Sequence, residues 1–148
     1  MIEDLQTVQS SQVVSQPMEL ATSGQRFANY LLDVIIIYVS AFVAGVVLYI
    51  VGLGDVIDRI DDTLLGIILV LLYYVPQESL FGWTLGKLIT GTRIVKEDGS
   101  PISFGQGLGR SLCRFIPFEA FSFLGGNGKP VGWHDSITKT RVISIRKR

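Results

Sequence analysis

The first long apolar run of the chain begins directly after two charged residues, Arg26 and Asp33. Both lie in the stretch "GQRFANYLLDVIIIYVSAFVAG", residues 24–45, and the 21 residues from Val34 to Gly54 contain no Lys, Arg, Asp, Glu or His. A helix needs about 20 apolar residues to cross the hydrocarbon core of a bilayer. The pattern therefore predicts a membrane-spanning helix over about residues 30–53, with two charges where the hydrocarbon begins.

A second apolar stretch follows the acidic linker "GDVIDRIDD". Its uncharged part, residues 63–77, is short for a span, and an extension to Trp83 includes Pro76 and Glu78. Proline is tolerated inside membrane helices when neighbouring groups satisfy the freed carbonyl. Tryptophan is typical of the membrane–water interface. We therefore expect a second span over about residues 63–83 that continues through Pro76 with a kink.

A third hydrophobic segment, "LGRSLCRFIPFEAFSFLGG", has a different pattern. Its apolar residues recur at helical spacing on one face, while Gln106, Arg110 and Arg114 gather on the other. This pattern is typical of an amphipathic helix that lies in a membrane interface. Pro117 interrupts the pattern, and the remainder is too short to cross a bilayer. We expect an interfacial or re-entrant helical segment over about residues 104–124, in preference to a third span.

Two similar hexads lie on either side of the third hydrophobic segment: "TGTRIV" at residues 90–95 and "TKTRVI" at residues 138–143. Both end in β-branched residues, which favour strands, and "EDGSP" after the first hexad supplies turn residues. We expect the two hexads to pair like a β-hairpin on the cytoplasmic side. The pairing would tie the C-terminal part of the chain to the end of the second span.

The composition favours a membrane protein over a soluble domain. Hydrophobic residues make up 48% of the 148 residues, and the mean hydropathy is +0.43. Residues 1–23 are rich in Gln, Ser and Val and contain no basic residue, so they lack the positive region of a signal peptide. We expect them to form a mostly disordered polar tail. The single cysteine, Cys113, cannot form an intramolecular disulfide.

The distribution of charge predicts the orientation, although the net charge is zero. The linker between the spans has one basic residue, Arg59, whereas eleven lie between Gly82 and the C-terminus. Basic residues near span ends stay cytoplasmic, so we expect a multi-pass protein of a bacterial-type inner membrane with both termini in the cytoplasm. Arg146, Lys147 and Arg148 are expected to contact acidic lipid headgroups, at about 1 kcal/mol each. The basic tail is too short to predict nucleic-acid binding.

The charges at the first span are the candidate functional residues. Arg26 and Asp33 are seven residues apart, or two helical turns, so they lie on one stripe of the helix. A charge at the bilayer centre costs at least about 2.5 to 3.5 kcal/mol, so this stripe is expected to face protein. The candidate partners are Glu78, near the inner end of the second span, and the pair His134 and Asp135. Two interpretations stay open: an ion or proton site, or a structural clamp of buried, hydrogen-bonded charges.

Other motifs do not carry a prediction of chemistry. "GWTLGK" has one residue too few for a phosphate-binding loop, and Leu88 stands where a hydroxyl would be needed. "GQGLGR" is an isolated glycine cluster that favours close packing over dinucleotide binding. His134 is the one histidine and has no cysteine nearby to complete a zinc site. We therefore expect no enzyme activity, no cofactor and no metal.

Three stretches resemble the RDD family of small integral membrane proteins, named for one arginine and two aspartates. They are "RFANYLLD", "TLGKLITGTRIVKEDGSPISFGQGLGR" and "WHDSITKTRVI". The resemblance covers about residues 24–145, between the polar tail and the basic C-terminus at residues 146–148. It implies that Arg26, Asp33 and Asp135 form the family motif, and it implies about three spans and a transport-related role. The short, interrupted third segment departs from that pattern.

Two functions follow from these expectations. In the first, an ion or small solute exchanges at a site built from Asp33, Glu78 and Asp135 with Arg26 as counter-charge, in a homo-oligomer because two spans cannot enclose a path. In the second, the protein is a non-enzymatic membrane module that binds lipid or another membrane protein, and its charges specify the fold. The two differ in whether neutralising the acidic groups abolishes flux without unfolding the protein.

Overall fold

The fold was analysed in a computed structural model, which describes residues 18–118, 121–122 and 129–145. Most of the expected polar tail and the basic residues Arg146, Lys147 and Arg148 lie outside the described residues, as do parts of the third hydrophobic segment. The structure is mostly helical. In chain order the elements are α2 (Ser23–Ile50), α3 (Gly54–Ile57), α4 (Asp62–Phe81), α5 (Leu85–Thr90), β1 (Thr92–Lys96), α6 (Phe104–Cys113), α7 (Trp133–Thr138) and β2 (Thr140–Ser144).

The two expected apolar helices are present as α2, of 28 residues, and α4, of 20 residues. Helix α2 begins earlier than residue 30 because Thr22 and Gln25 form a capping box, in which each side chain accepts a hydrogen bond from the other residue's backbone N–H. Helix α4 continues through Pro76 and ends at Gly82, whose φ of 72° suits glycine. Both helices are long and apolar enough to cross a membrane.

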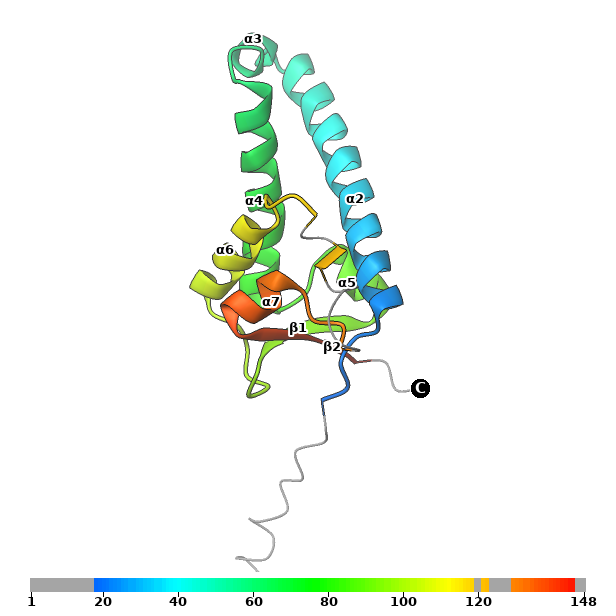
Figure 1. Cartoon of the computed structure of the whole chain (residues 1–148). Coiled ribbons are helices and arrows are strands. Elements are labelled where there is room, and N and C mark those ends of the chain that lie inside the picture. Colours follow the sequence, from blue (N-terminus) through cyan, green and yellow to red (C-terminus); the bar gives the residue numbers. More distant parts are fainter. Residues whose placement is uncertain (1–17, 119–120, 123–128, 146–148) are drawn as a thin grey trace, which may run out of the picture.

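The long helices α2 and α4 approach each other near α3 and diverge toward their other ends (Figure 1). The short helices and the strands gather at the diverging ends. There α5 packs against α2 and α6 packs against α4, whereas α2 and α4 make few direct contacts. The distance between the two long helices is therefore set by the elements between their diverging ends.

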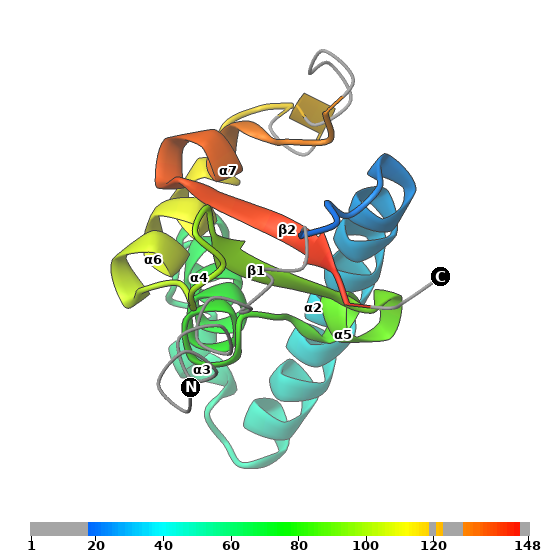
Figure 2. The same ribbon diagram turned by 90° about the horizontal axis from the view of Figure 1, so that it is seen from below.

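Strands β1 and β2 form a two-stranded antiparallel sheet, which confirms the predicted pairing of the two hexads. Ile94 pairs with Val142, and both side chains are buried. Together with Ala21 and Ile102 they form a small apolar core. Viewed along the long helices from the sheet end, the sheet extends from the side of α2 to the side of α4 and α6 (Figure 2). The sheet thus joins the two diverging helices.

The third hydrophobic segment contains a helix, α6, which is shorter than the expected 104–124. Its ten residues bury Arg110 and Ser111 completely, whereas Phe104 and Leu112 are 65% and 51% exposed. A helix that lies on a membrane surface turns its charged face to water. Helix α6 turns that face toward the interior of the protein, because Arg110 finds carboxylates there.

Helix α5 approaches α2 closely at Gly86. A Cβ atom at Gly86 would lie 2.6 Å from Oδ1 of Asp33 and 2.9 Å from the backbone oxygen of Asn29. Backbone cannot move away as a flexible side chain can. The absence of a side chain at Gly86 is therefore a condition for the contact between the two helices.

We predict that Gly86→Ala destabilises the protein by about 1 to 3 kcal/mol, because the added methyl overpacks the contact. Thermal unfolding in detergent would measure the change. Gly105→Ala is the matched control, since a Cβ there meets no atom within 4 Å. Equal melting temperatures for the two variants would show that the contact between α5 and α2 is looser than described.

Candidate functional site

Seven charged residues converge between the diverging ends of α2 and α4, and we call them the charge cluster. All except Arg114 are buried, and the side chain of Arg114 is 15% exposed. The charge cluster comprises the carboxylates of Asp33, Glu78 and Asp135 and the basic groups of Arg26, Lys87, Arg110 and Arg114. Burial of a charge costs several kcal/mol unless the charge is paired and hydrogen-bonded. The pairs within the cluster therefore decide whether the fold is stable.

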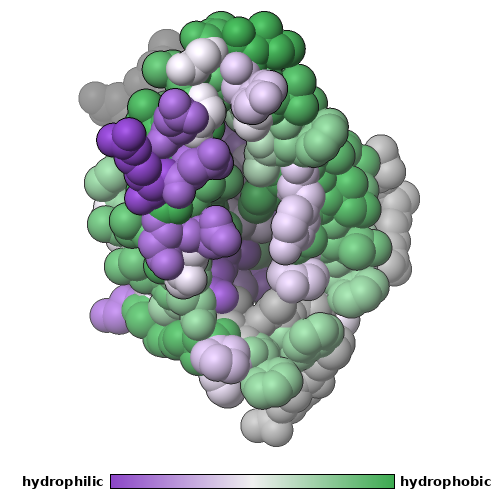
Figure 3. Space-filling model, turned by 90° about the horizontal axis from the view of Figure 1, so that it is seen from above, coloured by the Kyte–Doolittle hydropathy of each residue, from purple (hydrophilic) through white to green (hydrophobic). Residues whose placement is uncertain are grey.

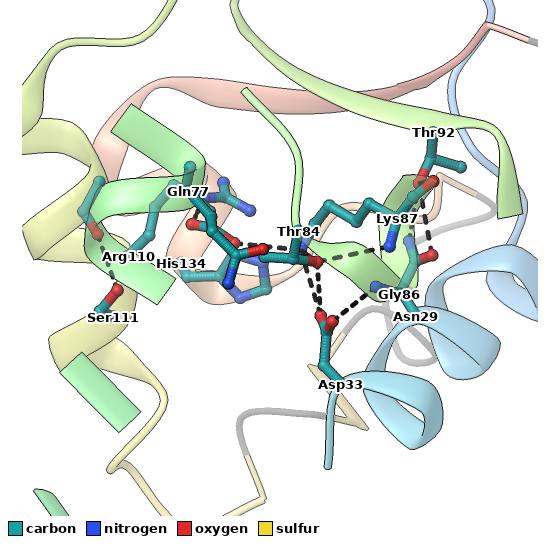
Figure 4. Close-up of polar contacts among 12 residues, drawn as sticks. Asn29, Asp33, Gln77, Thr84, Gly86, Lys87, Thr92, Arg110, Ser111 and His134 are labelled. Carbon is teal, nitrogen blue, oxygen red and sulfur yellow. Dashed lines mark hydrogen bonds and ion pairs between the residues drawn. The ribbon is translucent and has the colours of Figure 1, made fainter. Parts of the chain in front are cut away.

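Asp33 fastens α2 to the start of α5. Its Oδ1 accepts hydrogen bonds from the Tyr73 hydroxyl at 2.8 Å and from the backbone N–H of Gly86 at 2.9 Å. Its Oδ2 accepts one from the Thr84 hydroxyl at 2.7 Å (Figure 4). Nζ of Lys87 lies 3.8 Å from the same oxygen. Three hydrogen bonds and one cation thus compensate the buried carboxylate.

Glu78 contacts three basic groups. Its Oε1 lies 3.0 Å from Nζ of Lys87 and 2.6 Å from Nη2 of Arg114, and its Oε2 lies 3.3 Å from Nε of Arg110. Lys87 therefore stands between Glu78 and Asp33, so the two carboxylates expected at the inner ends of the spans share a cation.

Asp135, at the start of α7, is held from several sides. Its Oδ1 lies 2.5 Å from Nη1 of Arg110, and its Oδ2 lies 2.6 Å from Nη2 of Arg26. The backbone N–H of Gly132 donates to Oδ2 at 3.1 Å, which also caps α7. Nε2 of His134 lies 3.3 Å from Oδ1. Asp135 thus joins α2 and α6 to the C-terminal part of the chain.

Arg110 connects the two halves of the charge cluster. The side chain is fully buried and contacts Glu78 through Nε and Asp135 through Nη1. Nη1 also donates to the hydroxyl of Thr140 at 2.5 Å. One guanidinium group on α6 therefore links α4, α7 and β2.

Outside the long helices, the surroundings of Asp135 and Lys87 shift the pKa of each side chain. Burial alone would raise the pKa of Asp135, but the positive charges of Arg110, His134 and Arg26 outweigh it and hold that pKa well below its usual range. Burial lowers the pKa of Lys87, and the nearby carboxylates oppose this only in part. Asp135 therefore stays ionised at neutral pH.

A neutral network lies beside the charges. Nδ2 of Asn29 donates to the hydroxyl of Thr92 at 3.0 Å, and the hydroxyl of Thr90 donates to Oδ1 of Asn29. Figure 4 shows Asn29 and Asp33 of α2 both turned toward the segment that contains Thr84, Gly86 and Lys87. This network joins α2 to β1.

The structure brings together all five residues that the sequence indicated: Arg26, Asp33, Glu78, His134 and Asp135. Arg26 and Asp33 are buried on α2 together with Asn29, as the predicted stripe requires. Arg26 contacts Asp135, which is one of the candidate partners named from the sequence.

Sequence reasoning missed the roles of Lys87 and Thr84, and it treated Arg110 and Arg114 only as the polar face of an interfacial helix. The signal for Lys87 and Thr84 was available, because they are polar residues directly after the second apolar stretch. Within the part of the chain that is described, no group of three or more His, Cys, Asp or Glu residues could hold a metal ion.

A cavity of about 380 Å³ adjoins the charge cluster between α2 and α4. Both polar and apolar residues line it. The lining residues include the charged side chains Arg26, Asp33, Lys87, Arg110 and Arg114 together with His134, and the apolar ones include Val34, Ile37, Val70, Phe115 and Ile116. Viewed from the α3 end, the molecule is hollowed along its centre (Figure 3).

We predict that Arg26→Ala destabilises the protein by about 3 to 5 kcal/mol, because it removes a cation from the buried Asp135 carboxylate. The double variant Arg26→Ala with Asp135→Asn should recover part of this loss, since the side chain that lost one of its two guanidinium partners is then neutral, although Arg110 also loses a carboxylate. Melting curves in detergent would measure all variants.

The control for this prediction is Arg26→Ala combined with Asp33→Asn. The three donors and Lys87 around Asp33 do not involve Arg26, so this combination should give no recovery. Recovery with Asp33→Asn instead of Asp135→Asn would contradict the pairing.

Comparison with known proteins gives two matches. The model of the RDD family matches residues 20–139. The chain is also 33% identical over 144 residues to "Uncharacterized protein YxaI" of Bacillus subtilis (strain 168), an alignment that covers 80% of this chain and 93% of that protein. No solved structure matches the chain.

Proposed function

Since the chain belongs to the RDD family, we propose that it is a multi-pass membrane protein that acts as a non-enzymatic binding module for lipid or for another membrane protein. The observation that carries this proposal is the complete pairing of the three carboxylates in the charge cluster. Asp33, Glu78 and Asp135 each have basic groups within 2.5 to 3.8 Å. A carboxylate with such partners holds the fold together and offers no open position to a cation.

The surfaces of the long helices support a place in the membrane. Tyr38, Phe42 and Tyr49 on α2 are 73%, 73% and 78% exposed, and Leu72 on α4 is 66% exposed. Soluble proteins rarely expose apolar patches of this extent. The buried residues of α2 are polar instead. This arrangement, polar inside and apolar outside, suits a helix that contacts hydrocarbon.

The distribution of charge along the structure supports the proposed orientation. The acidic residues Asp55, Asp58, Asp61 and Asp62 lie at the α3 end, whereas the strands and α6 lie at the opposite end (Figure 1). Eleven basic residues follow Gly82. We place the strand end in the cytoplasm of a bacterial-type cell by the preference of basic residues for that side. The cytoplasmic face then also holds both termini.

Exchange of an ion or small solute is the second candidate function. The cavity beside Arg26, Asp33 and Lys87 favours it, because a cavity with polar groups can take a solute. It would require a homo-oligomer and a carboxylate that releases its basic partner during each cycle. The charge cluster, in which each carboxylate is held by several groups, favours the binding module.

A flux assay distinguishes the two candidates. We predict that purified protein in liposomes gives no flux above protein-free liposomes under sodium, potassium, lithium or proton gradients. Asp33→Asn, checked for folding by its melting curve, is the matched variant. Flux by the unaltered protein that Asp33→Asn abolishes without unfolding would show that the binding-module proposal is wrong.

The orientation is tested by cysteine labelling in a Cys113→Ser background. We predict that Ser11→Cys and Arg148→Cys react with a membrane-impermeant thiol reagent only from the cytoplasmic side, while Asp58→Cys reacts only from outside. The reason is that two spans return the chain to the side where it began. External labelling of Arg148→Cys would mean that a third segment crosses the membrane.

A further inference from the structure

We propose that the cavity beside the charge cluster binds an anionic amphiphile. The anionic headgroup, a phosphate or carboxylate, contacts the basic wall, and the hydrocarbon chain lies between α2 and α4. The inference rests on the proposed function, because it names the chemical class of lipid that such a module would bind. It follows from the charge of the wall, from an unpartnered donor and from the apolar lining of the cavity.

The residues that line the cavity include more basic groups than carboxylates, although Glu78 and Asp135 lie directly behind these basic groups. The cluster has four basic groups and three carboxylates, so its net charge, which does not count His134, is +1. Of these carboxylates only Asp33 is among the residues that line the cavity, whereas all four basic residues are. The wall therefore presents four cations and one carboxylate, and Asp33 already accepts three hydrogen bonds. Such a wall attracts an anion.

The Nη2 atom of Arg110 is a buried hydrogen-bond donor that indicates a ligand. The side chain is fully buried, and within the described part of the chain its Nη2 atom has no hydrogen-bond partner. Nε and Nη1 are occupied by Glu78 and by Asp135 and Thr140. A buried donor without a partner costs about 1 to 3 kcal/mol. Arg110 is among the residues that line the cavity, and an anion there that uncovers and reaches Nη2, which has almost no accessible surface in this conformation, would remove this cost.

Arg114 lines the cavity together with Tyr74. Its guanidinium carbon lies 3.8 Å from the centre of the Tyr74 ring, and its Nη2 contacts Glu78. The side chain of Arg114 is partly exposed. A planar guanidinium group is suited to two parallel hydrogen bonds to phosphate or carboxylate.

The rest of the wall selects an amphiphile over a free anion. Val34, Ile37 and Val70 of the two long helices face the cavity, together with Phe115 and Ile116 after α6. The hollow that these helices border is visible along the molecule (Figure 3). The volume of about 380 Å³ is within the range of small-molecule sites. A hydrocarbon chain between the long helices would shield these apolar side chains from water, whereas a hydrated ion would not.

The test is a binding assay on the full-length protein in detergent, with native mass spectrometry as readout. The probes are phosphatidic acid, a fatty acid, phosphatidylcholine with the same acyl chains as the phosphatidic acid, and inorganic phosphate. We expect phosphatidic acid and the fatty acid to bind, and phosphatidylcholine and inorganic phosphate to bind at least about tenfold more weakly. Phosphatidylcholine carries a choline cation that offsets its phosphate charge, and inorganic phosphate has no hydrocarbon to cover the apolar lining.

Two variants locate the site. Ile37→Trp fills space beside the apolar lining of the cavity, and Tyr38→Trp is its matched control because Tyr38 is 73% exposed and does not line the cavity. Arg114→Gln removes one basic group while Glu78 keeps Lys87 and Arg110. We expect Ile37→Trp and Arg114→Gln each to weaken phosphatidic acid binding by about tenfold or more, and Tyr38→Trp to leave it unchanged. Melting curves would establish that all three variants are folded.

Three results would overturn the inference: equal binding of phosphatidic acid and phosphatidylcholine, equal effects of Ile37→Trp and Tyr38→Trp, or binding of inorganic phosphate as tight as that of phosphatidic acid. The last result would assign the wall to a free anion. These failures leave the proposed binding module standing, since it can still bind a membrane protein. Conversely, cation flux in the liposome assay would contradict the proposed binding module but would leave the measured lipid binding unaffected.

Discussion

The buried guanidinium group of Arg110 constrains most of the structure. A charge removed from water costs several kcal/mol unless carboxylates and hydrogen-bond acceptors surround it. Arg110 meets this condition with Glu78 of α4, Asp135 of α7 and Thr140 of β2. These partners lie far apart in the sequence, so the position of α6 fixes where the C-terminal helix and strand lie. Arg26 then joins α2 to the same assembly through Asp135.

This constraint matters all the more because the apolar core among the described residues is small. Ile94, Val142 and two further residues form it, whereas the long helices turn their apolar side chains outward. Between helices in hydrocarbon, apolar burial gives little driving force, and packing and polar contacts determine association. The interior near the diverging helix ends is accordingly polar, and the same polar wall makes the adjoining cavity basic.

The sequence predicts the two long helices and the sheet well, but not the short helices α3, α5 and α7, and it predicts the partners of the elements less well. Runs without charge predict α2 and α4, and the matching hexads predict the sheet, because both signals are local. The spacing of Arg26 and Asp33 predicts a buried stripe. Periodicity separates the two faces of α6 but does not say which face turns inward. That depends on carboxylates elsewhere in the chain, so the orientation of Arg110 and the bridging position of Lys87 could not be derived.

The central claim is that Arg110 couples two carboxylates that belong to different parts of the chain. A double-mutant cycle between Glu78→Gln and Asp135→Asn, followed by melting curves in detergent, tests it most directly. Because both residues share Arg110, their effects on the free energy of unfolding should be non-additive by about 0.5 to 3 kcal/mol. Glu97→Gln is the control for Glu78→Gln, since Glu97 pairs with Arg141 on the sheet and should be additive with Asp135→Asn. Additive effects of Glu78→Gln and Asp135→Asn would contradict the account.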